Sequence, residues 1–310
     1  MRYSNNSERR IYRGLTNMQN NPNIELLEQS VEGASDLYFV NEGGYKTVYK
    51  AIIDGNKEAL KVVFIPPENG QQEANNEIFL RVKREIESLA KCECPYLVKL
   101  GKLAPRSISI EGHNYLVYSE EFLEGKTLFE QIRNGNRPNL KRCKSLFICL
   151  LEVIRELKTK DLIHRDIKPG NIFSLDDLAR PFVVLDLGIA LKIHSTAITR
   201  NPEMRIGTLP YMAPEMFIPS FRDYLDYRSD LYSAAVTIYE YASGKHPITR
   251  RGEDDYTTIY RIAHQIPIPL NQHRPDMQES FCSHIDQLTR KIPALRPSNL
   301  ERLIKIVEAM

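Results

Sequence analysis

The sequence predicts an α+β protein of two lobes, a small β-rich lobe followed by a larger helical one. Three segments rich in β-branched and aromatic residues, 37–40, 47–53 and 58–64, come early and have the length of strands. After Gly125 the apolar residues recur instead at helical spacing. Strands followed by helices, without βαβ alternation, favour two lobes over one parallel sheet.

We expect three parts along the chain. Residues 1–34 are polar and predict an N-terminal leader, either flexible or a strap on the main body, with a short helix over 24–31. Residues 35–120 form the first lobe and residues 121–310 the second.

Turn and break signals order the elements of the first lobe. Asp54-Gly55-Asn56 predicts a tight turn between the second and third strands. A proline-rich break follows at 66–70, and a long helix runs from there to about Lys91. Two further strands are expected at 97–103 and 115–118.

The second lobe reads as helices with a few short strands. Leu146, Leu150, Ile154 and Leu157 are spaced as one apolar helix face, and a second apolar helix spans 231–242 before Gly244. The short apolar runs 171–173 and 182–185 are expected to be strands.

Composition excludes several classes of protein. The 310 residues carry 42 Lys and Arg against 40 Asp and Glu, a net charge of +2, which argues against nucleic-acid binding as the main activity. No apolar run reaches the roughly 18–20 residues of a membrane span, and the first 13 residues do not resemble a secretory signal. Five cysteines form no disulfide framework, so we expect a cytoplasmic protein.

Four short motifs carry the chemical signal. They are the run His164-Arg165-Asp166-Ile167-Lys168-Pro169-Gly170-Asn171, then Asp186-Leu187-Gly188, then Gly207-Thr208-Leu209-Pro210-Tyr211-Met212-Ala213-Pro214-Glu215, and upstream Lys61 in an apolar strand. In their order along the chain these motifs resemble those of the eukaryotic-like (Hanks-type) protein kinases, over residues 37–310. Lys168 and Thr208 resemble the residues of the Ser/Thr branch. The resemblance implies a bilobal protein kinase-like fold.

The resemblance also implies the catalytic and metal-binding residues. Asp166 would orient the substrate hydroxyl and accept its proton, and Lys168 would lie beside the transferring phosphoryl group. Lys61 would hold the α- and β-phosphates with Glu85 as its acidic partner on the long helix, whereas Glu87 points away. Magnesium ligands would be the oxygens of Asn171 and Asp186; Mn²⁺ would also fit.

ATP binding is assigned in the same way. The adenine ring would lie among Val48, Ala59 and Phe173, with the backbone of Glu121 and Leu123 as hydrogen-bonding partners. The phosphate loop would contain Gly43 and Gly44.

Two departures from the family pattern concern this nucleotide site. The loop glycines before and after Gly43 are replaced by Asn41 and Lys46, which weakens the close approach of backbone to phosphate, and we hypothesise that the charge of Lys46 partly compensates. Glu120 takes the gatekeeper position beside adenine, where an unpaired carboxylate would be costly. Leu187 replaces the common Phe after the metal-binding Asp.

Further residues are given structural or regulatory roles by the resemblance. Asp230 would hold the backbone of the catalytic loop, and a plain helix N-cap would be compatible with that role. Arg296 would pair with Glu215, and Thr208 would bond to Asp166 and Lys168. Arg165 would receive a phosphate on a candidate phosphosite; the candidates are Ser195, Thr196 and Thr199.

The sequence therefore favours a Ser/Thr protein kinase that transfers the γ-phosphoryl group of ATP to protein hydroxyls and phosphorylates itself. The alternative is a pseudokinase, a binding module with weak or no turnover, which the altered loop and Glu120 favour. A small-molecule kinase fits less well, because the Ala213-Pro214-Glu215 segment builds a platform for peptide. We expect the partners to be protein substrates, and we expect neither nucleic-acid binding nor a membrane segment. The sequence leaves dimerisation open.

Overall fold

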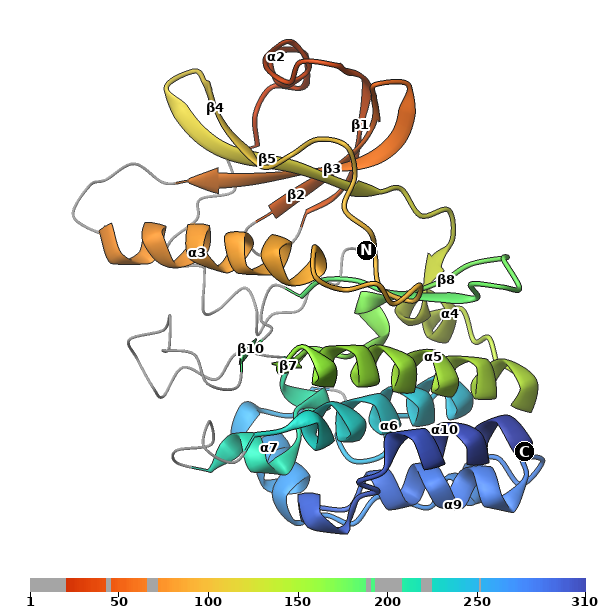
Figure 1. The fold of residues 1–310 in the computed structure, drawn as a ribbon. Helices are drawn as coiled ribbons and strands as arrows, with labels where there is room; N and C mark the ends of the chain where they lie inside the picture. The colour runs from red at the N-terminus through yellow and green to blue at the C-terminus, as the bar shows by residue number, and fades with distance from the viewer. Residues whose placement is uncertain are drawn as a thin grey trace. The chain divides into compact units, whose positions relative to one another are not determined.

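The computed structural model describes residues 21–42, 46–65, 72–187, 191–192, 208–218, 225–250 and 252–310, without the side chains of 72–78, 81 and 191–192 (Figure 1). The chain divides into two compact units. Unit 1 combines Met1–Ala90 with Val98–Leu123, and unit 2 combines Lys91–Leu97 with Glu124–Met310. Some residues singled out by sequence lie outside the described ranges: Gly43, Gly44, Ser195, Thr196 and Thr199.

Unit 1 is built on an antiparallel sheet with strand order β1-β2-β3-β5-β4. The strands are β1 (Ala34–Glu42), β2 (Lys46–Ile53), β3 (Asn56–Ile65), β4 (Arg106–Ile110) and β5 (His113–Glu121). The predicted turn joins β2 to β3, with positive φ at Asp54 (47°) and Gly55 (76°), the backbone that a two-residue hairpin requires.

The strand predicted at 97–103 is wrong. That segment makes two isolated bridges, Leu97 to Val184 and Leu100 to Glu120, and the regular strand β4 follows it. The sequence does carry the signal for β4: serine and isoleucine alternate over 107–110, and the Glu111-Gly112 turn has positive φ at both residues. The segment 97–103 is rich in apolar residues but contains Gly101, which weakens a strand.

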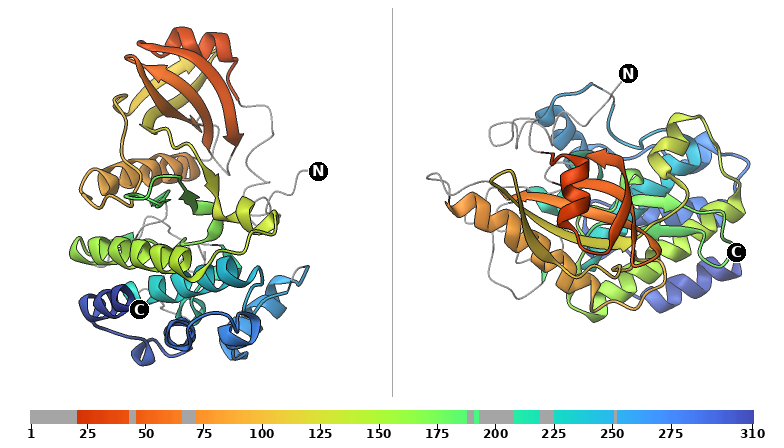
Figure 2. Two further views of the ribbon diagram at one scale, coloured as in Figure 1. Left: turned by 90° about the vertical axis from the view of Figure 1, so that its right-hand side faces the viewer. Right: turned by 90° about the horizontal axis from the view of Figure 1, so that it is seen from above.

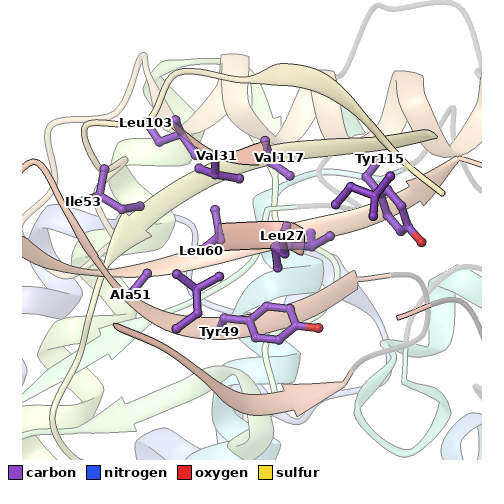
Figure 3. Packing of buried hydrophobic residues seen from close by; sticks show 12 residues of the cluster. Leu27, Val31, Tyr49, Ala51, Ile53, Leu60, Leu103, Tyr115 and Val117 are labelled. Carbon is purple, nitrogen blue, oxygen red and sulfur yellow. The ribbon is translucent and has the colours of Figure 1, made fainter. Parts of the chain in front are cut away.

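One face of this sheet packs against helix α2 (Ile24–Ser30), whose first turn is capped by the side chain of Asn23. Leu27 and Val31 are buried there, among Tyr49, Leu60 and other sheet residues (Figure 3). The sequence left open whether the leader is flexible or a strap on the main body. Residues 24–31 form a strap, because they contribute to the core of unit 1.

The other face of the sheet packs against helix α3 (Gln72–Leu89). Val82 and Ile86 of this helix are buried against Val63, Leu116 and Tyr118. Because side chains alternate along a strand, residues two apart from these on β3 and β5 also point toward α3. The same holds for Lys46 of β2, which is paired with Val63, and for the residues two apart from Lys46 along β2.

Unit 2 is mainly helical. Its two longest helices, α5 (Leu140–Thr159) and α6 (Tyr227–Ser243), pack together, and the C-terminal helix α10 (Leu300–Ala309) contacts α5 (Figures 1 and 2). The remaining helices are α4 (Leu128–Arg133), α7 (Asp255–His264), α8 (Leu270–His273) and α9 (Glu279–Leu288). Across the described residues, none of the helices has both the length and the apolar character needed to cross a bilayer.

Short strands of unit 2 frame the segments that carry the motifs. One small sheet contains β6 (Lys126–Thr127), β8 (Ile172–Ser174) and β9 (Phe182–Val184), and a second pairs β7 (Leu162–Ile163) with β10 (Leu191–Lys192). Residues 164–171 therefore lie between β7 and β8, and Asp186 comes two residues after β9.

A buried ion pair connects two distant segments of unit 2. Arg296 donates to both carboxylate oxygens of Glu215, at 2.6 and 2.8 Å, and Ser229 donates a third bond to the same carboxylate at 2.7 Å. The Arg296 guanidinium also lies 5.0 Å from the ring centre of Tyr232. Because the pair is buried, each charge depends on the other for compensation.

We predict that Arg296→Met destabilises the chain by about 3–5 kcal/mol, because it leaves the Glu215 carboxylate without its cation in a buried site. Urea unfolding would measure the loss. Arg302→Met, which changes an exposed arginine of α10, should shift the free energy of unfolding by less than about 0.5 kcal/mol. Equal effects from the two variants would contradict a structural role for the pair.

His246 is buried, and its hydrogen bonds fix one tautomer of the neutral ring. Its Nδ1 accepts from the amides of Ile248 and Thr249, at 3.2 and 2.9 Å, and so its Nε2–H is directed to the carbonyl of Pro210 at 3.1 Å. Burial lowers the pKa of His246 to about 4. Protonation would place a proton on the nitrogen that accepts both amides.

The stability of the folded chain should therefore fall toward acid partly through His246. The unfolded state takes up this proton near pH 6.5 and the folded state near pH 4, so the contribution is complete above pH 6.5 and is lost between these values. Removing the imidazole with His246→Gln should flatten the fall in melting temperature over that window. An acid profile as steep as that of the wild type would show that His246 does not contribute.

Candidate active site

The backbone of the segment after β7 is held by one buried carboxylate. Asp230 accepts hydrogen bonds from the amides of His164, at 2.7 Å, and Arg165, at 2.9 Å. Burial raises the pKa of Asp230, and these two amide bonds act against that rise. The N-cap of α6 is Asp226, so an N-cap role for Asp230 is wrong. Arg165 adopts a positive φ of 69°, a strained backbone that the Asp230 contact helps to hold.

Asp166 lies at the centre of a compact polar cluster. Its Oδ1 accepts from the hydroxyl of Thr208 at 2.9 Å and from the Thr208 amide at 3.1 Å. Its Oδ2 lies 2.8 Å from the Lys168 ammonium and accepts from the Asn171 amide nitrogen at 2.8 Å. Lys168 also donates to the Thr208 hydroxyl. Four donors therefore fix the orientation of one carboxylate, as a group that must accept a proton in a defined direction requires.

Of the two expected metal ligands, Asn171 belongs to this cluster and Asp186 comes 15 residues later in the chain. The side-chain nitrogen of Asn171 is committed to Asp166, at 3.0 Å from its carbonyl and 2.8 Å from its carboxylate, so its amide oxygen is the atom oriented to serve as a ligand. Asp186 is half-buried with a positive φ of 66°, and the Leu185 amide donates to the Asn171 carbonyl at 2.8 Å. One carboxylate and one amide oxygen form a donor set that fits Mg²⁺.

Unit 1 pairs its lysines differently from the expectation. The ammonium of Lys61 lies 2.9 Å from Glu120, and Glu85 instead receives Lys46, whose Nζ is 2.8 and 2.9 Å from its two oxygens. The expected Lys61–Glu85 pair is therefore corrected. All four side chains are buried, with exposed fractions of 0–9%.

The register of the sheet explains this exchange. Lys61 of β3 lies opposite Tyr118 of β5, so Glu120 is its diagonal neighbour on the face toward α3. At this position near the end of β5, burial of an unpaired Glu120 carboxylate would be costly, and Lys61 supplies the cation. Its Oε1 is nevertheless buried without a hydrogen-bond partner in the described structure.

The residues expected around adenine are distributed over both units. Val48 and Ala59 lie on β2 and β3 of unit 1, two residues from Lys46 and Lys61 respectively and on the same face. Glu121 ends β5, where its amide donates to the Lys99 carbonyl, and Leu123 closes unit 1. Phe173 is half-buried in β8 of unit 2. Their contacts with a nucleotide stay predictions.

Sequence reasoning identified Lys46 as a charge near phosphate but missed its partner. The alternation of side chains along β2 does indicate on which face of the sheet Lys46 lies. Lys46 and Val48 alternate with the buried Thr47 and Tyr49, so a strand that directs Val48 toward the nucleotide also directs Lys46 to the face of Lys61.

Comparison with known proteins supports the family that the motifs resemble. The family model described as "Protein kinase domain" matches residues 35–306. The chain is 29% identical over 220 residues to the probable serine/threonine-protein kinase PknB of Bifidobacterium longum, covering 68% of this chain and 31% of the relative. It is 27% identical over 272 residues to the probable serine/threonine-protein kinase CPE1738 of Clostridium perfringens, covering 88% and 37%.

A third relative, the serine/threonine-protein kinase pkn2 of Myxococcus xanthus, is 28% identical over 279 residues, covering 87% of this chain and 31% of the relative. The chain thus spans about a third of the length of these curated relatives. The match of the family model over most of the sequence, together with the motifs described above, shows that the chain belongs to the protein kinase family.

Proposed function

We propose that this chain is an active serine/threonine protein kinase that transfers the γ-phosphoryl group of ATP to a hydroxyl group of a protein. The observation that supports activity most directly is the Asp166 cluster. Lys168, Asn171 and Thr208 orient its carboxylate through contacts of 2.8–3.1 Å. A pseudokinase would have no need to keep an intact proton acceptor with these donors.

The residues divide the chemistry of phosphoryl transfer. Asp166 accepts the proton of the attacking hydroxyl, and Lys168 stabilises negative charge on the transferring group. Asn171 and Asp186 hold Mg²⁺ or Mn²⁺, which neutralises charge on the phosphates. In unit 1, Lys61 binds phosphate oxygens, while Val48, Ala59 and the backbone of Glu121 and Leu123 bind the base.

The pseudokinase alternative draws support from the first unit. Lys61 is paired with Glu120, so phosphate must compete with a buried carboxylate for this lysine. Glycines are also replaced at Asn41 and Lys46. These features would weaken nucleotide binding without touching the Asp166 cluster, and so a direct test of turnover separates the two functions.

We predict that the wild-type chain gains mass in steps of one phosphate when it is incubated with ATP and Mg²⁺, and that it phosphorylates a generic protein substrate. Asp166→Asn removes the proton acceptor at nearly constant shape and should lower the rate by about 10²–10⁴-fold. Asp186→Asn should abolish the Mg²⁺-dependent gain. Intact-mass spectrometry and a radiolabel transfer assay would measure both.

Asp176→Asn provides the matched control, since it makes the same change at an exposed carboxylate in the loop between β8 and β9 and should keep the wild-type rate. Peptide mapping would then test Ser195, Thr196 and Thr199 as acceptor sites, with Arg165 as their proposed phosphate-binding partner. A wild-type chain that binds ATP but transfers phosphate to neither itself nor a substrate would instead support the pseudokinase.

A further inference from the structure

Unit 1 contains two buried lysines, each held by its own buried carboxylate. Lys46 contacts both oxygens of Glu85, and Lys61 contacts Glu120 at 2.9 Å. Glu85 belongs to helix α3 and is fully buried, whereas Glu120 belongs to strand β5. The contact between sheet and helix that was expected of Lys61 is thus made by Lys46.

The two lysines are neighbours on one surface. Val48 of β2 lies opposite Lys61 of β3, and Lys46 is two residues from Val48 along the strand. Lys46 and Lys61 are therefore diagonal neighbours on the face toward α3, with backbone positions about 7–8 Å apart. A lysine side chain is longer than half this distance, so the two ammonium groups have the length to meet at one oxyanion group.

The position of Lys46 in the chain gives the reason for a second cation. It is the first residue of β2, directly after the loop in which the family pattern places glycines that let backbone amides approach phosphate. A lysine at the last of these positions gives up that close backbone approach, and its ammonium supplies charge at the same end of the strand. The Glu85 contact holds the side chain in a defined direction, which lowers the entropy lost on binding an anion. Phosphate then competes with Glu85 for this ammonium, as it competes with Glu120 for Lys61.

We propose that Lys46 is a second phosphate-binding residue of the nucleotide site, and that through Glu85 it couples helix α3 to the bound phosphates. Lys61, held by Glu120, binds phosphate beside it. This inference rests on the proposed function, because it requires that the chain binds a nucleotide. Its specific content is that Lys46 recognises the phosphates and contributes nothing to recognition of the nucleoside.

The test compares two ligands that differ only in their phosphates. Isothermal titration of the full chain with adenosine and with ADP in the presence of Mg²⁺ would give both affinities for the wild type and for Lys46→Met. We expect Lys46→Met to weaken ADP at least about tenfold, the effect of losing one charge-assisted contact, and to leave adenosine affinity unchanged. Lys57→Met, at an exposed lysine of β3, should change neither.

A second variant covers a loss of folding. If Lys46→Met is unstable because the Glu85 carboxylate loses a cation, the double variant Lys46→Met with Glu85→Met replaces the pair by apolar side chains of similar size, which buried sites often tolerate. The same selective loss of ADP affinity is expected from it.

The remaining outcomes overturn the inference. Unchanged ADP affinity in either variant would show that Lys46 does not contact phosphate, and an equal loss for ADP and adenosine would show that the pair only shapes the unit. Neither result would affect the proposed function. A wild-type chain that binds no ADP at all would overturn both.

Discussion

A buried carboxylate must be matched by donors, and this constraint organises the candidate site. In unit 2 the Asp230 carboxylate takes the amides of His164 and Arg165, which fixes the backbone that leads into Asp166. Only on a fixed backbone do Thr208 and its neighbours meet the Asp166 carboxylate at hydrogen-bond distance. The backbone that carries Asp166, the proposed proton acceptor, is thus held by a residue 64 positions away in the sequence.

The same constraint has a different solution in unit 1. A single lysine between β3 and α3 would leave Glu120 buried without a cation, and the presence of Lys46 allows both carboxylates to be compensated. Because Glu120 lies on β5, Lys61 forms its ion pair within the sheet. Glu85 of α3 is paired with Lys46 of β2 instead. An unusual residue at one position of the sheet thus determines the partners of two others.

The strand and helix patterns were sufficient to predict the two-part fold, because they are written in short segments of sequence. Helix α6 and the turn at Asp54 were found for the same reason. The contacts of Thr208 with Asp166 and Lys168 join segments about 40 residues apart, and they were expected only from the resemblance to the protein kinases. The exchange of partners between Lys46 and Lys61 was not predicted, since it depends on strand register and on which of several buried groups compete for one charge. Strand β4 was not predicted, because the apolar segment 97–103 was expected to be the strand in place of the alternating residues 107–110.

The two buried pairs also bear on what the first unit is selected for. Replacing a buried ion pair by apolar side chains is often neutral or stabilising, so stability alone gives little reason to keep Lys46 and Glu85. Sites that must bind a charged ligand are where such costs are expected, because the cation has to be in place before the anion arrives. The Lys61–Glu120 pair has the same character, and its carboxylate retains a buried oxygen, Oε1, without a partner in the described structure. Two buried charge pairs on one face, one of them with an unsatisfied carboxylate oxygen, are better explained by a ligand than by packing.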